Sequence, residues 1–347
     1  MWDGRYHQTD RVISMSLQAK IKSYLDQIKI IPGIENAVLT QRDGNPIQST
    51  GVWLSKNEIF EVCSAASAIF NVGIYLHPDQ LKFILIEGDK AKVLIAPLRT
   101  KGNSPLDRVL SMQGLDAQDN EYFIAITTRP NANLGGIFLK TREALLNIKR
   151  ALVTSGESFK PPLVKYNQQR VREMLSSFDL KEDLEVQERI ARFTIGLPVS
   201  VSKQIEELIH KFSLVVQDLQ FSCLTLNGGF IISSYTHPSL GYVNVEAESA
   251  MNYSLYSTAN RCAWLLKKMR AKSVLLECDT YFQFMTAIRP GLFSAQVGKG
   301  RTKLGILRLV VPKYAQMIQS LVEQAIAPKK VPSPPNLREV LGSLVVK

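Results

Sequence analysis

The spacing of apolar residues changes several times along the first half of the chain, and each change marks a predicted element. Apolar residues three and four positions apart predict a helix over residues 16–31, which stops at Pro32-Gly33. Further on, short apolar runs predict strands and longer periodic stretches predict helices. These later elements are a hairpin around the turn at 42–44, a helix at 56–75, strands at 81–87, 91–98 and 121–128, and a helix at 134–153.

The second half of the chain shows the same succession of patterns. Its predicted elements are a helix at 201–215, strands at 220–226 and 230–236, a helix at 244–269, strands at 273–278, 281–288 and 292–297, and a helix at 303–326. Each half therefore has the order αββαβββα. That order predicts an α+β unit in which helices flank a five-stranded antiparallel sheet, and the chain contains two such units.

Short sequence matches between the two halves indicate an internal repeat. The matching segments are "AVLTQRDG" (37–44) with "SCLTLNGG" (222–229), "LIEGD" (85–89) with "LLECD" (275–279), and "NLGGIFLKTREALLNI" (133–148) with "KLGILRLVVPKYAQMI" (303–318). The segments keep their order along the chain, as a duplicated unit requires. The first copy is longer by the polar, turn-rich residues 99–120, which we predict to be a loop insertion.

The repeat divides the chain into four predicted regions. The first repeat covers residues 14–154 and the second covers 200–327. Between them, residues 155–199 contain two short amphipathic stripes and are predicted to be a helical linker. The last region, 328–347, is a Pro-rich tail with a short apolar end.

The middle helix of each repeat carries apolar or small residues on two faces. One face can cover the sheet of its own unit, so the second face needs another neighbour. The strands at 81–87 and 273–278 are nearly continuous in apolar residues, and such strands tend to aggregate when they form an open edge. We therefore predict that these two strands pair and that the middle helices touch, which makes the chain an intramolecular pseudo-dimer.

The predicted interface of this pseudo-dimer draws on both repeats. Its residues are Val62, Ala65, Ile69, Val72, Phe83, Leu85, Ala247, Ala250, Ser254, Ser257, Val274 and Leu276. Two alternatives stay open: both helices are ordinary core helices, or the pairing takes place between chains.

Composition and charge narrow the class of protein. With 347 residues, 45% of them hydrophobic, the chain can form a substantial core. No apolar run is long enough to span a membrane and the N-terminus lacks the order of a signal peptide, so we expect a cytoplasmic protein. The net charge of +11 is spread along the chain without interleaved aromatic residues, which argues against nucleic-acid binding. One basic edge, formed by Lys299, Arg301, Lys303 and Arg308, is a candidate partner surface.

The residues that could carry chemistry do not form a recognisable active site. The glycine-rich stretch "GKGRTKLG" (298–305) departs from the spacing of phosphate-binding loops, and we predict a strand-to-helix joint there. The four cysteines, Cys63, Cys223, Cys262 and Cys278, are isolated and fit buried free thiols. The repeated carboxylates Glu87, Asp89, Glu277 and Asp279 stand at strand ends, where turn chemistry explains them. We therefore expect no catalytic, cofactor-binding or metal-binding residues.

Several of these motifs together resemble the roadblock family, which includes the roadblock dynein light chains. In the first repeat, "IPGIENAVLTQRDGNPI", "LIEGD" and "NANLGGI" are similar to the family's Pro-Gly entry, Asp-Gly hairpin, central strand and Leu-Gly helix start. The second repeat lacks the Pro-Gly, has Asn-Gly-Gly in the hairpin, and places Pro312 inside its last helix, where a kink is expected. The chain as a whole resembles a tandem roadblock protein of prokaryotic or archaeal type.

The resemblance implies a non-catalytic fold that works in pairs and serves as a platform or regulator for small Ras-like GTPases. Other roadblock or longin-like proteins are further implied partners, and some family members stimulate GTP hydrolysis in a partner. Two other interpretations stay open. The chain could be a structural adaptor in a larger complex without a GTPase, or a basic protein that binds nucleic acid or an anionic membrane surface.

Overall fold

The computed structural model describes residues 16–51, 55–78, 80–99, 105–112, 122–155, 197–226, 231–289 and 291–326. In the first half, its elements are α1 (Leu17–Lys29), β1 (Ile34–Gln41), β2 (Pro46–Gly51), α2 (Lys56–Leu76), β3 (Leu81–Glu87), β4 (Lys92–Pro97), α3 (Pro105–Met112), β5 (Tyr122–Thr128) and α4 (Leu134–Ser155). Most of the predicted linker and the whole predicted tail lie outside the described residues.

The second half has the predicted order as well. Its elements are α7 (Val199–Val215), β6 (Leu219–Leu226), β7 (Ile231–Thr236), the 3-10 turn η2 (Pro238–Leu240), α8 (Val245–Lys267), β8 (Ser273–Cys278), β9 (Tyr281–Ile288), β10 (Gly291–Gly298) and α9 (Leu304–Ile326). Helix α9 continues through Pro312. Apart from the additional helix α3 in the first half, the αββαβββα order predicted from apolar spacing is confirmed in both halves.

The insertion in the first repeat corrects one expectation. Residues 99–120 were expected to form a loop, but Pro105–Met112 within them form the helix α3. Proline suits the first position of a helix because its missing N–H would have no partner there. A helix of two turns is too short to show the sustained apolar period that a sequence window needs.

The chain divides into two compact units whose boundary differs from that of the sequence repeats. The first unit takes Ser254–Gln283 from the second repeat in addition to the first repeat itself. The second unit contains Lys181–Tyr253 and Phe284–Lys347. The predicted domain limits at 14–154 and 200–327 stay predictions.

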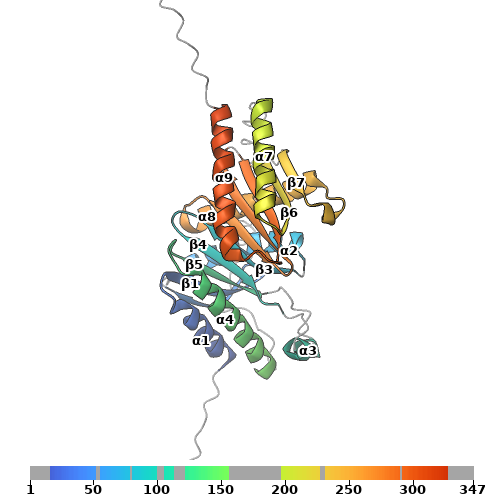
Figure 1. Ribbon diagram of the computed structural model, residues 1–347. Coiled ribbons are helices and arrows are strands. Elements are labelled where there is room, and N and C mark those ends of the chain that lie inside the picture. Colours follow the sequence, from blue (N-terminus) through green and yellow to red (C-terminus); the bar gives the residue numbers. More distant parts are fainter. Residues whose placement is uncertain are drawn as a thin grey trace, which may run out of the picture. The chain divides into compact units, whose positions relative to one another are not determined.

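The first unit is a layered structure around an antiparallel sheet with the strand order β2-β1-β5-β4-β3-β8. Helices α1 and α4 pack side by side (Figure 1). Phe83 on β3 stacks on Phe138 of α4 at 4.4 Å between ring centroids, whereas its neighbour Ile84 packs against Gly73 of α2. Successive strand residues point to opposite faces, so α4 and α2 cover opposite faces of this sheet.

Helix α2 is the most apolar helix of this unit. By length and composition its stretch Asn57–Leu76 could cross a membrane, but 56% of that stretch is buried inside the structure. Phe70 packs against Phe123 of β5 at 4.4 Å, and the Thr40 hydroxyl of β1 donates a hydrogen bond to the Cys63 sulfur. These contacts describe a core helix.

In the second unit, the strand order is β9-β10-β6-β7, with antiparallel pairing of β10 with β6 and of β6 with β7. Helices α7 and α9 pack together and lie side by side in Figure 1. Phe212 of α7 contacts both Tyr314 of α9, at 5.1 Å between ring centroids, and Phe293 of β10, at 5.6 Å. The core of this unit therefore lies between the two helices and the sheet.

Candidate functional site

The two repeats meet where β3 pairs with β8, and we call this strand pair with the side chains around it the seam. The strands are antiparallel, with Phe83 opposite Glu277, Leu85 opposite Leu275 and Ile86 opposite Val274. The predicted pairing of residues 81–87 with 273–278 is therefore confirmed. Backbone hydrogen bonds continue past the strands, because the Lys272 N–H donates to the Glu87 carbonyl at 2.8 Å.

The predicted interface residues on the two strands all lie in this seam and are buried. Phe83 and Leu85 point to the α4 face of the sheet, as the stacking of Phe83 on Phe138 shows. Val274 and Leu276 stand opposite Ile86 and Ile84, so they point to the α2 face. Apolar burial on both faces is what the continuous apolar pattern of the two strands predicts.

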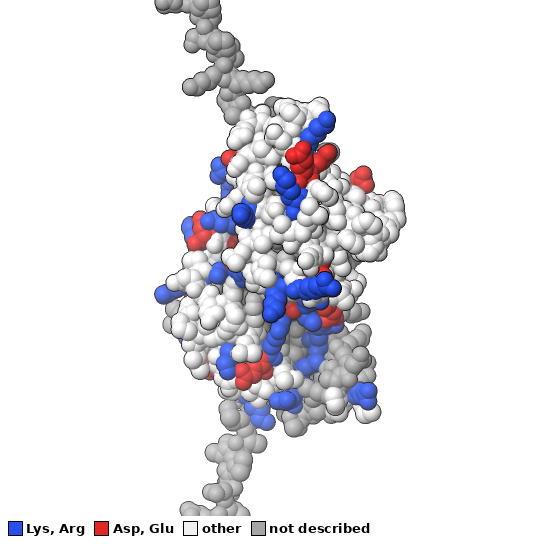
Figure 2. All heavy atoms as spheres, in the orientation of Figure 1, with Lys and Arg blue, Asp and Glu red and all other residues white. Residues whose placement is uncertain are grey.

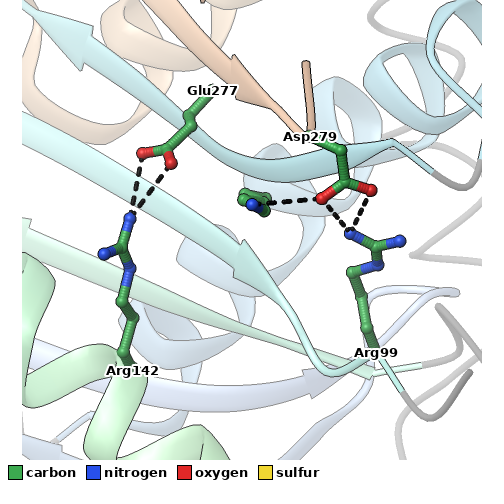
Figure 3. A network of polar contacts seen from close by, with 5 residues as sticks. Arg99, Arg142, Glu277 and Asp279 are labelled. Carbon is green, nitrogen blue, oxygen red and sulfur yellow. Dashed lines mark hydrogen bonds and ion pairs between the residues drawn. The ribbon is translucent and has the colours of Figure 1, made fainter. Parts of the chain in front are cut away.

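The α4 face of the seam also holds two ion pairs that join the repeats (Figure 3). One guanidinium nitrogen of Arg142, on α4, donates to both Glu277 oxygens at 3.1 Å. Arg99, just after β4, donates to both Asp279 oxygens at 3.0 and 2.9 Å. Lys82 of β3 lies 3.1 Å from the same carboxylate of Asp279. Each carboxylate comes from the second repeat and each cation from the first.

Burial and charge act differently on these carboxylates. The Glu277 side chain is only 8% exposed, while its partner Arg142 is 62% exposed, so a buried anion is met by a cation that reaches in from the surface. For Asp279, burial pushes the pKa upward, but the hydrogen bonds and charges of Arg99 and Lys82 outweigh it and hold the pKa below its usual value. Asp279 is therefore charged at neutral pH, as an ion pair requires.

Further polar contacts tie the second repeat to the first within the same unit. Lys267 at the end of α8 pairs with Glu35 of β1. The His77 Nδ1 lies 2.6 Å from the Tyr281 hydroxyl, and burial lowers the pKa of His77 from 6.5 to about 4. His77 is therefore neutral near pH 7, and one hydrogen bond to tyrosine suits a neutral imidazole.

Three of the four repeated carboxylates, Glu87, Glu277 and Asp279, form ion pairs, and this arrangement suits a joint between strands. Glu277 and Asp279 are held by arginine and lysine, and Glu87 lies 3.7 Å from Lys92. Sequence reasoning noticed the carboxylates because both repeats carry them, but it missed their partners Arg99 and Arg142. The repetition of the carboxylates was the signal in the sequence that pointed to them. Their arginine partners lie 180 and 135 residues away in the chain, and no local pattern links residues so far apart.

The two middle helices differ in where their predicted second faces lie. In α2, Val62, Ala65 and Ile69 are buried and Val72 is half-buried. In α8, Ala247, Ala250 and Ser254 are exposed and Ser257 is half-buried. The contact between the two helices stays a prediction, and the small residues of α8 are at the surface of the units described.

The stretch "GKGRTKLG" connects β10 to α9, as the sequence predicts, and its backbone is directed at a carboxylate of the protein itself. Asp218 accepts hydrogen bonds from the backbone N–H groups of Arg301 and Thr302, both at 2.7 Å, and from the Thr302 hydroxyl at 3.0 Å. A Cβ on Gly300 would lie 2.4 Å from an Asp218 oxygen. The glycine therefore makes room for this carboxylate.

The predicted basic edge lies around this joint. Arg301 and Lys303 are exposed, and Lys299 and Arg308 are half-buried. The Arg301 side chain is available to solvent while its backbone is fixed by Asp218. In this view of the surface, Lys, Arg, Asp and Glu occur as separate small groups over α7 and α9, and uncharged atoms make up most of the area between them (Figure 2).

All four cysteines are buried free thiols, as their apolar surroundings predict. Burial raises the pKa of Cys63 and Cys262 to about 12 and that of Cys223 to about 11. Such thiols are protonated and poor nucleophiles at neutral pH. Among the described residues, no group of three or more His, Cys, Asp or Glu side chains is placed to hold a metal ion.

The chain is similar to solved structures, and the other two comparisons found no match. No protein-family model matches the chain, and no curated protein matches it. Solved structures of roadblock-type proteins are similar to a domain-sized part of it. "MglB with tetrameric arrangement" has a TM-score of 0.36 and 12% identity, and the match covers 38% of this chain and 98% of that one.

Two more solved structures match a similar share of the chain. MglB of Myxococcus xanthus has a TM-score of 0.34 and 16% identity, with 38% of this chain and 94% of that chain covered. The roadblock/LC7 domain from Streptomyces avermitilis has a TM-score of 0.29 and 13% identity, with 38% and 96% covered. The α+β fold of this chain is described by its repeated element order and its strand order.

Proposed function

We propose that this protein is a non-catalytic scaffold or regulator that binds a small Ras-like GTPase through a platform built from its two roadblock-like repeats. The observation that carries the proposal is the seam, in which one edge strand of each repeat pairs with the other and ion pairs join the two repeats. The resemblance of the first repeat to roadblock domains supplies the partner class. We place this activity in the cytoplasm.

In this proposal, one chain supplies both halves of the platform as an intramolecular pseudo-dimer. The two halves differ in sequence, so the platform is asymmetric and can offer a partner one preferred face. The basic edge with Arg301 and Lys303 is the proposed face, because exposed cations on a fixed backbone steer and orient an acidic partner surface. Other roadblock or longin-like proteins would join through the remaining surfaces.

The test is a direct binding measurement with the full chain. Each small Ras-like GTPase of the source organism is loaded with GDP or with a non-hydrolysable GTP analogue, and the chain is titrated into it in a calorimeter. We expect one GTPase to bind in a nucleotide-dependent way. Absence of binding to every such GTPase in both nucleotide states would overturn the proposal.

The role of the basic edge is tested in the same system. Arg301→Ala is expected to weaken binding of the GTPase or, if the arginine acts on the nucleotide, to slow hydrolysis by the bound GTPase. Arg289→Ala is the matched control, because Arg289 is also an exposed arginine of the same unit and lies between β9 and β10. If both variants and the unchanged chain have equal affinities and hydrolysis rates, the basic edge is not the face that binds the GTPase.

A further inference from the structure

A short segment that follows the last helix of each repeat occurs twice in the chain. "VREMLSSF" at 171–178 and "LREVLGSL" at 337–344 share Arg, Glu, Leu and Ser at the same four positions. The other positions are similar, with Val and Leu, Met and Val, Ser and Gly, and Phe and Leu. A Pro-Pro pair precedes each segment, at 161–162 and at 334–335. The duplication therefore extends past the sheet and its helices to this octapeptide, which follows its Pro-Pro pair at a different distance in each copy.

The octapeptide has the pattern of a helix with one apolar face. In the second copy, Leu337, Val340, Leu341 and Leu344 stand at positions i, i+3, i+4 and i+7, which place them on one side of a helix. A helix this short does not hold together alone in water and needs a surface on which to pack. The segment carries one arginine and one glutamate, so its attraction to a surface comes mainly from its apolar side.

The second unit exposes an apolar surface on the helix that leads to this segment. On α9, Leu309 is 77% exposed, and Ile306, one turn earlier, is also exposed. Leu214 and Val215 are exposed at the end of the neighbouring helix α7. The end of α7 lies beside the first half of α9, because Phe212 contacts Tyr314 and Asp218 bonds to Thr302. Exposed leucines and valines at such a helix pair are typical of a docking surface.

The first repeat carries the same combination. Its Leu139 matches Leu309 in the internal repeat and is 66% exposed on α4, and its Ile30, which matches Val215, is exposed after α1. Each repeat thus has an exposed apolar position on its last helix and an octapeptide further along the chain. A surface and a segment that are duplicated together are expected to serve one another.

The spacer has the length needed to bring the segment of the second repeat back to this surface. From Leu309 to the end of α9 at Ile326, the helix advances about 26 Å. Residues 327–336 contain four prolines and, in the extended conformation that proline favours, span about 31 Å. The tail can therefore run back along α9 and reach the level of Leu309 and Ile306.

We propose that residues 337–344 dock as a short helix on the apolar surface formed by Ile306 and Leu309 of α9 and by Leu214 and Val215 of α7. Leu337, Val340, Leu341 and Leu344 face these residues, and the polar side of the segment faces water. The docked segment covers the outer side of α9 next to the basic edge.

Hydrogen exchange of the full chain tests the docking without any partner, so its outcome is independent of the proposed GTPase function. We expect the backbone amides of 337–344 to exchange at least about tenfold more slowly than in the free octapeptide. Leu309→Asp and Leu341→Asp are each expected to remove this protection, because a carboxylate in an apolar contact is not solvated. Gln316→Asp is the matched control, since Gln316 is an exposed residue of the same helix, and it is expected to leave the protection unchanged.

A swap of the two octapeptides sharpens the test. Replacing residues 337–344 with the sequence of 171–178 is expected to keep the protection, whereas a scrambled sequence of the same composition is expected to lose it. The amides of β6 and β10 serve as an internal reference that the second unit is folded. Exchange of 337–344 at the free-peptide rate, or protection that survives Leu309→Asp, would overturn the proposal. Protection that grows with protein concentration would also overturn it, because the segment would then sit on a second copy of the chain.

Discussion

The turn after the first helix is built differently in the two repeats. In the first repeat, Gly33 has φ +92, and a Cβ there would lie 3.0 Å from the Cβ of Ala132. In the second repeat, the matching residues are Asp218 and Thr302, and the carboxylate of Asp218 accepts hydrogen bonds from the backbone and the hydroxyl of Thr302. The same two parts of the fold are thus held by close apolar contact in one case and by a carboxylate in the other.

The backbone of the turn is nevertheless anchored alike. The Gly33 carbonyl accepts a hydrogen bond from the Arg129 N–H at 2.8 Å, and the Asp218 carbonyl accepts one from the Gly298 N–H, also at 2.8 Å. The comparison explains why the second repeat has no Pro-Gly at this turn and has a glycine-rich stretch before α9 instead. The glycine that permits close approach has moved from one side of the joint to the other, from Gly33 to Gly300.

The largest expected effect on stability comes from adding a side chain at Gly33, where the turn after α1 contacts Ala132. Gly33→Val should lower the free energy of unfolding by about 3–4 kcal/mol, because it places a branched residue at positive φ and drives a side chain into Ala132. Urea unfolding, followed by hydrogen exchange of β1 and β5, measures the loss. Gly135→Ala is the control and should change stability by less than about 1 kcal/mol, since a Cβ there meets only the Asn133 side chain. Similar stabilities for the two variants would contradict the close-contact account.

The next largest effect on stability comes from the ion pair between Arg142 and Glu277, which joins the two repeats. Arg142 in the first repeat matches Pro312 in the second, so the ion pair with Glu277 occurs only once. Arg142→Ala should lower the free energy of unfolding by about 1–2 kcal/mol, because Glu277 stays buried after losing this cation. Arg142→Lys should restore part of the loss. Lys140→Ala is the control, because Lys140 is a half-buried residue of the same helix whose ion pair, with Glu143, stays within that helix. If Arg142→Ala and Lys140→Ala unfold at the same urea concentration, the ion pair of Arg142 with Glu277 contributes nothing to the seam.

Removing the Asp218 carboxylate should lower the free energy of unfolding by a similar or smaller amount. Asp218→Ala is expected to cost about 1–2 kcal/mol, because the backbone N–H groups of Arg301 and Thr302 lose their acceptor at the start of α9. Hydrogen exchange should localise the change to the first turns of α9. Asp218→Asn keeps an acceptor oxygen, so its free energy of unfolding should lie between those of the unchanged chain and Asp218→Ala. A variant Asp218→Ala as stable as the unchanged chain would mean that water replaces the carboxylate fully.

The smallest effect is a pH dependence of the same joint. The backbone hydrogen bond from Thr302 is the largest influence on Asp218, and with the other bonds it holds the pKa of Asp218 below its usual value of 3.8. A lowered pKa adds stability above the unfolded value, and that stability is lost as the pH falls through the folded value. The difference in unfolding free energy between the unchanged chain and Asp218→Asn should therefore be constant above about pH 5 and shrink below pH 3.8. A difference that stays the same at pH 3 would contradict this account.

Much of the fold followed from local pattern, while the long-range polar contacts did not. Strands 81–87 and 273–278 were predicted with their observed bounds because continuous apolar runs flanked by turn residues leave little freedom. The predicted pairing of the two strands also held, since an apolar edge requires cover. Helix α3 was missed because two turns are too short for a periodic signal.

The candidate site was predicted only in its apolar part. Arg142 and Glu277 are brought together by the packing of α4 on the sheet, and no spacing in the sequence records that contact. Asp218 was missed for the same reason, although the departure of "GKGRTKLG" from phosphate-loop spacing pointed correctly to a joint. Ala247, Ala250 and Ser254 are exposed, and their predicted contact with α2 stays a prediction. Small residues on a helix fit both a close helix neighbour and a solvated face.

The strand β8 belongs by contact to the first compact unit and by sequence to the second repeat, and this affects how the chain can be divided. A fragment that stops between the repeats would leave β3 without its partner and expose an apolar strand edge to other molecules. A fragment that starts there would carry β8 without the strand it pairs with. Truncation at the linker, whether by a protease or in a recombinant fragment, should therefore yield halves that aggregate. Producing both halves together should prevent this, because β3 and β8 can then pair.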